Sequence, residues 1–175
     1  MTPTRTDYCE KPTLDHILAA LMPANRLAIL TSLQTGLRID DVLHLKTEDL
    51  KRDRFTVKEM KTGKSRRIRL TRDLREALFR QAGRFFVFEG RNDPKKPRTR
   101  QAVYKDLVRA QNAFRVKRIK IRPHSARKIY AVNAYRKCGD IKKVQALLNH
   151  SSEAVTMLYA LADEITAQTR QPREK

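Results

Sequence analysis

Apolar residues in the first third of the chain recur at the three- and four-residue spacing of amphipathic helices. This spacing predicts a first helix that begins at Thr13 and ends before Pro23. A second helix is expected to begin at Pro23 and to stop at Gly36, because glycine suits the left-handed conformation found at helix C-termini. A third helix is expected over residues 39–45.

From position 54 the apolar period changes to two. Phe55 and Val57 alternate with charged or polar residues, and Ile68 and Leu70 do so again after a Lys-Thr-Gly-Lys turn. This pattern predicts an antiparallel β-hairpin with a basic turn. The apolar run at 85–88 predicts a third strand or a buried extended segment.

The second half of the chain returns to helical spacing. Thr71 and Thr99 stand where N-caps are expected, each before an apolar-periodic segment, and the second of these helices should bury Phe114. The polar, proline-containing stretch 89–98 predicts an exposed loop. Further helices are expected from Pro123 to Gly139, over 141–148 and from Ser152 through Tyr159.

These elements predict one mainly α (α+β) fold, a single compact helical domain with a small antiparallel β-sheet. No internal repeat or interdomain linker divides the chain. We expect a flexible N-terminal segment at 1–12, the domain itself at 13–165 and a flexible C-terminal tail at 166–175.

Charge changes the picture, because the 175 residues carry a formal net charge of +20. Residues 51–150 hold 31 of the 39 basic residues but only 8 of the 19 acidic ones, which indicates a basic surface built into the domain. Nucleic acid is therefore the first partner to consider. A membrane surface is the competing polyanion, but the apolar stretch Ile17–Met22 is too short for a span or a signal peptide. A soluble intracellular protein is expected.

Cysteine and histidine usage argues against a metal or cofactor. Cys9 and Cys138 are far apart, which gives neither a disulfide framework nor a zinc spacing. The four histidines form no recognised ligand pattern, and no glycine-rich phosphate loop is present. We expect the protein to work without metal and without a cofactor.

Five short motifs carry the candidate chemistry, and their order is more informative than any one of them. They are Arg38 within Thr-Gly-Leu-Arg-Ile-Asp-Asp, Lys61 in the hairpin turn, His124-x-x-Arg127, His150, and Tyr159 nine positions later. This set resembles the catalytic domain of the tyrosine recombinases, the phage integrase family, over residues 13–165. The resemblance implies that family's catalytic fold and a site-specific DNA recombinase.

Attack on a phosphodiester places negative charge on its non-bridging oxygens, and a planar guanidinium can contact two oxygens at once. Arg38 and Arg127 are therefore suited to clamp the phosphate without a metal. The resemblance implies that Tyr159 is the nucleophile and forms a covalent 3′-phosphotyrosyl link that needs no ATP. It also makes Asp41 the acidic residue that orients the arginine and the histidine.

The same resemblance assigns the proton transfers. Lys61 would protonate the leaving 5′-oxygen, with Lys64 and Lys58 as alternative hairpin candidates. His124 would assist proton transfer at the tyrosine hydroxyl, and it lies three residues before Arg127 on the same helical face. His150 would hydrogen-bond a phosphate oxygen.

Double-stranded DNA is the expected partner, and the basic clusters around the motifs would contact its phosphates independently of sequence. The candidate contact residues are Lys64, Arg66, Arg67, Lys117, Arg118, Lys120 and Arg122. The resemblance further implies a homo-tetramer on DNA and a cytoplasmic, nucleoid-associated location in bacteria. A monomer or a tetramer in free solution, and accessory DNA-bending or directionality proteins, are left open by the sequence.

Other interpretations of the same residues stand beside this one. Taken singly, Arg38 could be a surface residue, Lys61 a solvated turn residue and Tyr159 a core aromatic; only their joint order favours catalysis. A type IB topoisomerase and a DNA-binding regulator or integrase remnant that does not cut are the rival functions. The short N-terminal segment matches either an excised catalytic domain or the naturally short recombinases that invert fimbrial promoters.

Overall fold

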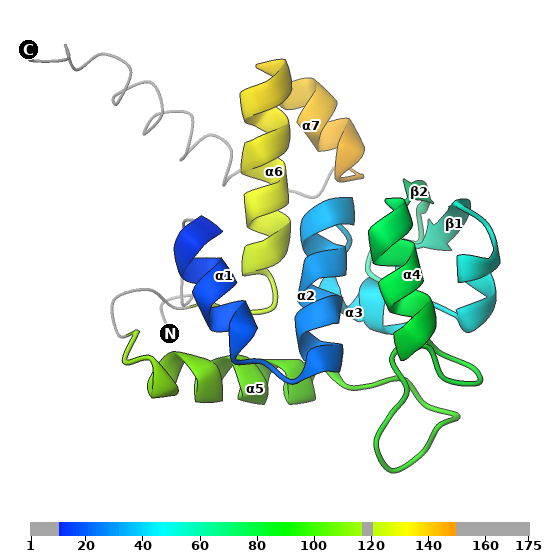
Figure 1. Ribbon diagram of the computed structural model, residues 1–175. Helices are drawn as coiled ribbons and strands as arrows, with labels where there is room; N and C mark the ends of the chain where they lie inside the picture. The colour runs from blue at the N-terminus through cyan, green and yellow to red at the C-terminus, as the bar shows by residue number, and fades with distance from the viewer. Residues whose placement is uncertain (1–10, 117–120, 150–175) are drawn as a thin grey trace, which may run out of the picture.

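The computed structural model describes residues 11–116 and 121–149, and Figure 1 shows a bundle of helices with a small hairpin at one side. Helix α2 is central, because it packs against four other helices. The helices are α1 (Lys11–Ala19), α2 (Pro23–Thr35), α3 (Ile39–Leu43), α4 (Arg72–Gln81), α5 (Arg100–Ala113), α6 (Ser125–Cys138) and α7 (Ile141–Leu147), with a 3-10 turn η1 (Thr47–Lys51). Strands β1 (Arg54–Lys58) and β2 (Ser65–Arg69) form the hairpin.

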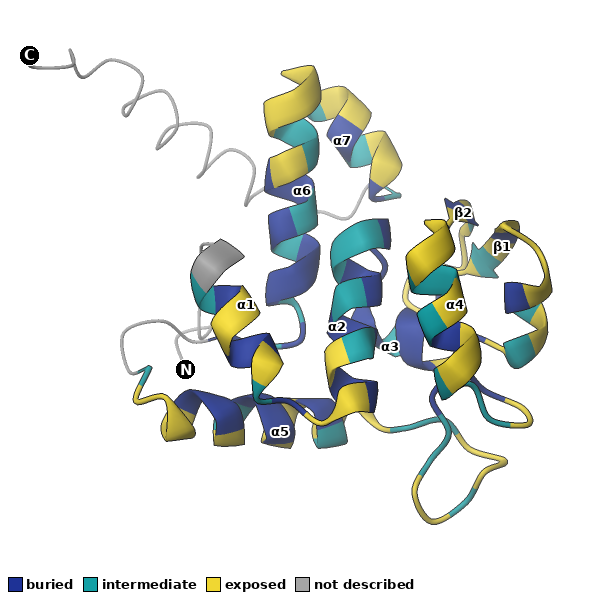
Figure 2. Cartoon of the chain, in the orientation of Figure 1, coloured by how far each residue is buried: buried dark blue, intermediate teal, exposed yellow. Residues whose placement is uncertain are grey.

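The core lies where the helices turn their apolar faces inward, as the dark blue stripes in Figure 2 show. Ile17, Leu37, Phe88 and Leu107 are among its fully buried side chains. A smaller cluster in which Val144 takes part joins α7 to α6. Helix α7 therefore packs mainly against α6. Its C-terminal end lies near the C-terminus of α2 (Figure 1).

The hairpin has the predicted two-residue period. Phe55 pairs with Ile68 and Val57 pairs with Arg66, which places these four side chains on the inner face. Phe55 and Ile68 are buried, whereas the alternate positions are exposed. Glu59 continues the inner face beyond β1 and is 0% exposed. A charged residue thus occupies the position where the pattern alone expects an apolar one.

The predicted helix caps are confirmed. The Thr71 hydroxyl accepts a hydrogen bond from the Leu74 N–H at 3.4 Å, and the Thr99 hydroxyl accepts one from the Ala102 N–H at 3.2 Å. Gly139 ends α6 with a left-handed φ of 63°. The predicted helix at 141–148 is present as α7, while the one from Ser152 through Tyr159 lies outside the described residues.

Three expectations need correction. Helix α1 begins at Lys11 rather than Thr13. In the run 85–88, Phe86, Val87 and Phe88 are buried, whereas Phe85 is 39% exposed. The run forms only a single bridge, Lys46 to Phe86, because the opposing chain turns into η1 at Thr47 and offers no further extended residues. Phe114 ends α5 at 38% exposure, with its ring against His16, so it does not join the core.

We predict that Gly36→Ala destabilises the protein far more than Gly139→Ala. Both glycines have left-handed φ values, 67° and 63°, so each alanine costs about 1 kcal/mol of backbone strain. At Gly36 a Cβ would also clash with the Tyr130 ring, whereas at Gly139 no atom of the described residues lies within 4 Å of it. Overpacking should add roughly 1–3 kcal/mol.

Urea unfolding of the two variants beside the original chain measures both costs. The matched backbone conformation makes Gly139→Ala the control, so the difference between the variants isolates the contact with Tyr130. Equal losses of unfolding free energy would show that the Tyr130 ring moves aside freely.

Candidate active site

The first candidate arginine is placed by the turn between α2 and α3. The left-handed Gly36 reverses the chain, and Leu37, which is 0% exposed, anchors the segment in the core. The Ser32 hydroxyl donates to the Leu37 carbonyl at 2.7 Å and fixes the turn further. Arg38 follows as the N-cap of α3 in an extended conformation, with its side chain only 7% exposed.

Arg38 pairs with a carboxylate that sequence analysis missed. Its Nη1 donates to Glu59 Oε2 at 2.6 Å, across 21 residues of sequence. Glu59 Oε2 also accepts a hydrogen bond from the Thr62 hydroxyl at 3.2 Å. The signal that could have revealed Glu59 is its register, since a carboxylate continues the inner-face alternation of Phe55 and Val57.

Asp41 lies one helical turn after Arg38 and is also buried. Its Oδ1 accepts a hydrogen bond from the Met60 N–H at 2.9 Å, which ties α3 to the hairpin turn. Its Oδ2 is buried without a hydrogen-bond partner in the described structure. Burial raises the pKa of the Asp41 carboxyl, and the charge of nearby Glu59 adds to this effect, while the Met60 N–H, Arg38 and Arg127 oppose it.

We predict that Asp41→Asn gains stability relative to the original chain as pH rises. Because the native pKa of Asp41 is raised, the folded state holds its proton above the usual range, and unfolding free energy falls as pH rises from about 3.8 through the native pKa. Asparagine has no such proton, and its carbonyl can still accept the Met60 N–H. Urea unfolding of both proteins between pH 3.5 and 7 measures the difference; a constant difference across this range would contradict the raised pKa.

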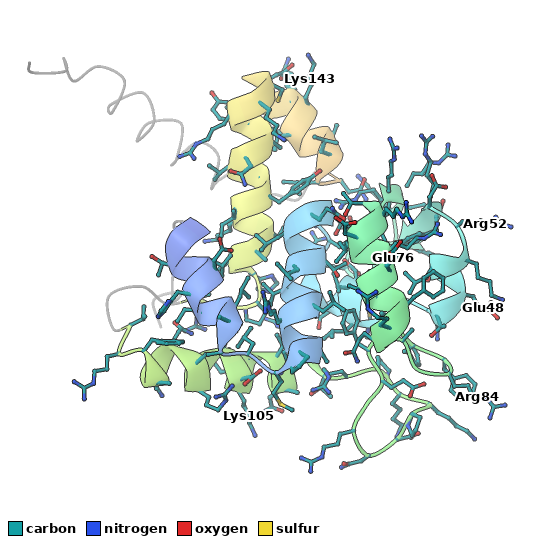
Figure 3. The ribbon with its side chains drawn as sticks, in the orientation of Figure 1. Glu48, Arg52, Glu76, Arg84, Lys105 and Lys143 are labelled. Carbon is teal, nitrogen blue, oxygen red and sulfur yellow. The ribbon has the colours of Figure 1, made fainter. Side chains whose placement is uncertain are left out.

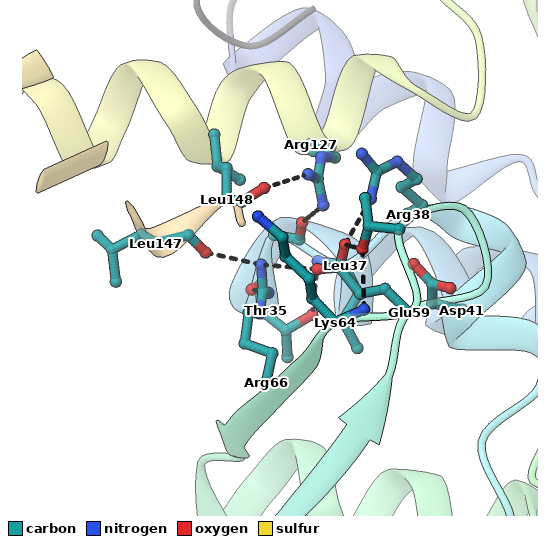
Figure 4. A network of polar contacts seen from close by, with 12 residues as sticks. Thr35, Leu37, Arg38, Asp41, Glu59, Lys64, Arg66, Arg127, Leu147 and Leu148 are labelled. Atoms are coloured by element: carbon teal, nitrogen blue, oxygen red, sulfur yellow. Dashed lines mark hydrogen bonds and ion pairs between the residues drawn. The ribbon is translucent and has the colours of Figure 1, made fainter. Parts of the chain in front are cut away.

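The second candidate arginine comes from the first turn of α6. Arg127 donates to the Gly36 carbonyl at 2.6 Å and to the Leu148 carbonyl at 3.0 Å. It therefore joins three segments, the α2–α3 turn, α6 and the end of α7 (Figure 4). Burial lowers the pKa of Arg127 to about 10, with the charge of Arg38 as the next cause. The guanidinium is still charged at neutral pH.

Arg66 lies inside the same cluster rather than on the outer face of the hairpin. Its guanidinium donates to the Leu147 carbonyl at 2.8 Å and to the Thr35 carbonyl, and its Nη1 lies 3.7 Å from Glu59 Oε1. Burial lowers the pKa of Arg66, while Glu59 opposes the shift. Sequence analysis had placed Arg66 among the DNA contacts, yet here its donors face protein groups.

His124 is the N-cap residue of α6, half-buried and three residues before Arg127. Its carbonyl accepts the Lys128 N–H at 3.2 Å, which begins the helix. The first turn of α6 therefore presents the histidine and the arginine of the His-x-x-Arg motif together, as their spacing predicts.

The hairpin lysines occupy different places. Lys61 and Lys64 are both exposed, Lys61 in the turn and Lys64 directly before β2, two positions before Arg66. The Lys64 carbonyl accepts the Glu59 N–H at 2.9 Å. Figure 4 draws Lys64 beside Arg66 and Glu59. Lys58 is exposed at the end of β1.

The remaining predicted residues are spread more widely. Arg67 is exposed on the outer face of β2, and Arg122 stacks over the Tyr104 ring at 5.8 Å. Helix α7 ends at Leu147 and the chain leaves the cluster at Leu148, two residues before His150. Outside the described residues lie His150, Tyr159, Lys117, Arg118 and Lys120.

The cluster thus brings three guanidiniums, Arg38, Arg66 and Arg127, together with the carboxylates of Asp41 and Glu59. Three cationic side chains stand beside two carboxylates, and a group of arginines with an excess of positive charge suits a phosphate group. Over residues 11–116 and 121–149 no group of three or more His, Cys, Asp or Glu side chains could hold a metal ion.

Among the described residues, every helix is too short or too polar to span a bilayer.

Comparison with known proteins gives consistent matches. The model of the phage integrase family matches residues 9–164. The probable integrase/recombinase YoeC of Bacillus subtilis (strain 168) is 30% identical over 139 residues, covering 77% of this chain and 75% of that protein.

Two solved structures share the fold. The XerH site-specific recombinase, bound to palindromic difH substrate in a post-cleavage complex, gives a TM-score of 0.73 at 21% identity, covering 96% of this chain and 53% of that one. A lambda integrase tetramer bound to a Holliday junction gives 0.70 at 22% identity, covering 90% of this chain and 49% of that one. The chain spans about half the length of each.

Proposed function

The chain belongs to the phage integrase family, the tyrosine recombinases, and we propose that it cleaves and rejoins DNA strands at specific sites through a covalent 3′-phosphotyrosyl intermediate on Tyr159. The observation that carries the proposal is the meeting of Arg38 and Arg127. These residues lie 89 positions apart, and Arg127 donates to the carbonyl of Gly36, two residues before Arg38.

The two guanidiniums supply the electrostatic part of the reaction. As Tyr159 attacks, negative charge grows on the non-bridging oxygens, and fixed charges in a partly dry site stabilise it without reorganising. Asp41 and Glu59 hold the segment that carries Arg38 against the hairpin turn. The clamp is therefore assembled before substrate binds, as positioning for catalysis requires.

Proton transfer completes each step. We assign the Tyr159 proton to His124 and the proton for the leaving 5′-oxygen to Lys61, with Lys64 and Lys58 as alternatives. His150 is assigned a hydrogen bond to a phosphate oxygen. The phosphotyrosyl bond conserves the energy of the broken phosphodiester, so rejoining to a new 5′-hydroxyl needs neither ATP nor metal.

Double-stranded DNA is the proposed substrate. Of the two solved relatives, XerH is described as bound to palindromic difH substrate and lambda integrase as a tetramer bound to a Holliday junction. We therefore propose that this chain exchanges strands as a homo-tetramer on DNA, is a monomer when free, receives help from accessory DNA-bending or directionality proteins, and acts in the bacterial cytoplasm where the nucleoid lies. The proposed domain covers residues 13–165, together with the first two residues of α1, which begins at Lys11.

A nicked suicide duplex tests the function. In this substrate the strand beyond the cleavage site is short enough to dissociate, so the covalent intermediate accumulates and is separated by denaturing electrophoresis. We expect a protein–DNA band from a pool of duplexes with randomised cores, undiminished by EDTA. A band with relaxation of any supercoiled plasmid, regardless of sequence, would favour a topoisomerase instead.

Absence of a band from this chain would be followed by fusion to a core-binding domain, which supplies the opposite half of a DNA clamp. A band that then forms would retain the proposal. No band from the fusion, together with salt-dependent DNA binding, would indicate a regulator that binds without cutting.

A further inference from the structure

Glu59 is the most buried charged side chain of the site, and it contacts two functional segments at once. Its Oε2 accepts hydrogen bonds from Arg38 Nη1 at 2.6 Å and from the Thr62 hydroxyl at 3.2 Å. Thr62 is the neighbour of Lys61 in the hairpin turn. One carboxylate oxygen therefore lies between the guanidinium assigned to the phosphate and the turn assigned to the proton donor (Figure 4).

The backbone of Glu59 also closes the turn. Its N–H donates to the Lys64 carbonyl at 2.9 Å, and its carbonyl accepts the Gly63 N–H at 2.8 Å. The next residue, Met60, donates its N–H to Asp41 at 2.9 Å. Two adjacent residues thus link the turn to α3. Met60 does so through its backbone N–H, and Glu59 does so through its carboxylate, which contacts the Arg38 guanidinium.

Charge explains why a carboxylate is needed here. Arg66 Nη1 lies 3.7 Å from Glu59 Oε1, and Arg127 is a further positive neighbour of Arg38. Without Glu59, buried like charges would drive the Arg38 guanidinium out of place. Within the described part of the chain, Glu59 is the hydrogen-bond partner of the Arg38 side chain, and it takes only one of the five N–H donors of the guanidinium. The others can still face a phosphate.

We propose that Glu59 is a positioning residue that couples the two halves of the chemistry. It fixes the position of the Arg38 guanidinium and, through the Thr62 hydroxyl, the position of the turn that carries Lys61. The phosphate clamp and the proton donor therefore move as one unit. This inference rests on the proposed function, because it assumes that Arg38 binds the scissile phosphate and that a turn lysine protonates the leaving group.

Thr62→Val tests the link to the turn, because valine keeps the shape of threonine and removes the hydroxyl that donates to Glu59 and accepts the Lys64 N–H at 3.3 Å. Single-turnover cleavage is measured on two suicide duplexes, one with the normal 5′-oxygen leaving group and one with sulfur in its place. A thiolate leaves without a proton, so an acid catalyst matters only for oxygen. We expect Thr62→Val to slow the oxygen substrate about tenfold and to leave the sulfur substrate unchanged.

Glu59 itself is then replaced. Glu59→Ala should slow the oxygen substrate at least about 100-fold and the sulfur substrate less, since both Arg38 and the turn are released. Glu59→Gln keeps both acceptor contacts but loses the negative charge, so it should recover only part of the rate. Glu76→Gln is the control, because it removes a carboxylate from an exposed ion pair with Arg72 on α4 (Figure 3). Equal slowing of both substrates by Thr62→Val and Glu59→Gln would overturn the coupling.

A second readout needs no activity. Hydrogen exchange of the Met60 and Gly63 amides in the free protein reports whether the turn is held. We expect faster exchange in Glu59→Ala and Thr62→Val, with Glu76→Gln unchanged. If neither the original chain nor its fusion to a core-binding domain forms a covalent complex, the proposed function fails while this measurement still decides the coupling; unchanged exchange in Glu59→Ala would reject it.

Discussion

Replacing Tyr159 with phenylalanine will eliminate the covalent protein–DNA complex and leave DNA binding within about twofold of the original chain. Phenylalanine keeps the ring but has no oxygen, so no phosphotyrosyl bond can form. Binding should persist because it depends chiefly on contacts between basic side chains and DNA phosphates. Denaturing electrophoresis on the suicide duplex measures the first quantity, and a gel shift at fixed salt measures the second.

Tyr104→Phe is the matched control for this experiment. Tyr104 lies on α5 with 38% exposure, so loss of its hydroxyl removes no buried hydrogen bond. This variant should form the complex at the original rate. If the band persists in Tyr159→Phe, the nucleophile lies elsewhere, and digestion of the complex followed by mass spectrometry of the DNA-linked peptide would identify it.

Much of the framework was predictable because it depends on local chemistry. A glycine after an apolar-periodic segment predicted the end of α2, and Gly36 indeed has a left-handed φ of 67°. Thr71 and Thr99 cap helices as their positions predict. The alternation around Phe55 predicted the hairpin and its inner face. The family's order of motifs predicted the recombinase class, which the match over residues 9–164 supports.

The buried ion pairs and hydrogen bonds of the site were not predictable in the same way. The contact between Arg38 and Glu59 crosses 21 residues, and the contacts of Arg66 with the ends of α2 and α7 cross 31 and 81. Such pairings depend on how the helices pack, and a pattern of spacing within one element carries no information about them. From the sequence alone, a basic residue in a hairpin such as Arg66 is expected to contact DNA. Its contacts with carbonyl oxygens become visible only once the packing of the helices is known.

The second large effect is expected at Arg127, where structure and chemistry depend on the same guanidinium. Arg127→Ala leaves the buried carbonyls of Gly36 and Leu148 without their donor, at about 1–3 kcal/mol each. Relief of repulsion with Arg38 offsets part of this, so we expect unfolding free energy to fall by roughly 2–4 kcal/mol. Cleavage should fall by about 1,000-fold or more, since a fixed charge beside the developing oxyanion is lost.

Arg127→Lys separates the two roles. Lysine keeps the charge but not the planar fork, so it can reach one carbonyl and cannot grip two oxygens at once. We expect it to restore part of the stability, measured by urea unfolding, while single-turnover cleavage stays at least about 100-fold below the original rate. Arg72→Ala, at an exposed site on α4, controls for the positive charge that Arg127→Ala removes. Full cleavage by Arg127→Lys would show that charge alone suffices, and the bidentate clamp would be withdrawn. Slow cleavage despite recovered stability would instead establish that the fork geometry, set by the Gly36 turn and the end of α7, is what the phosphate requires.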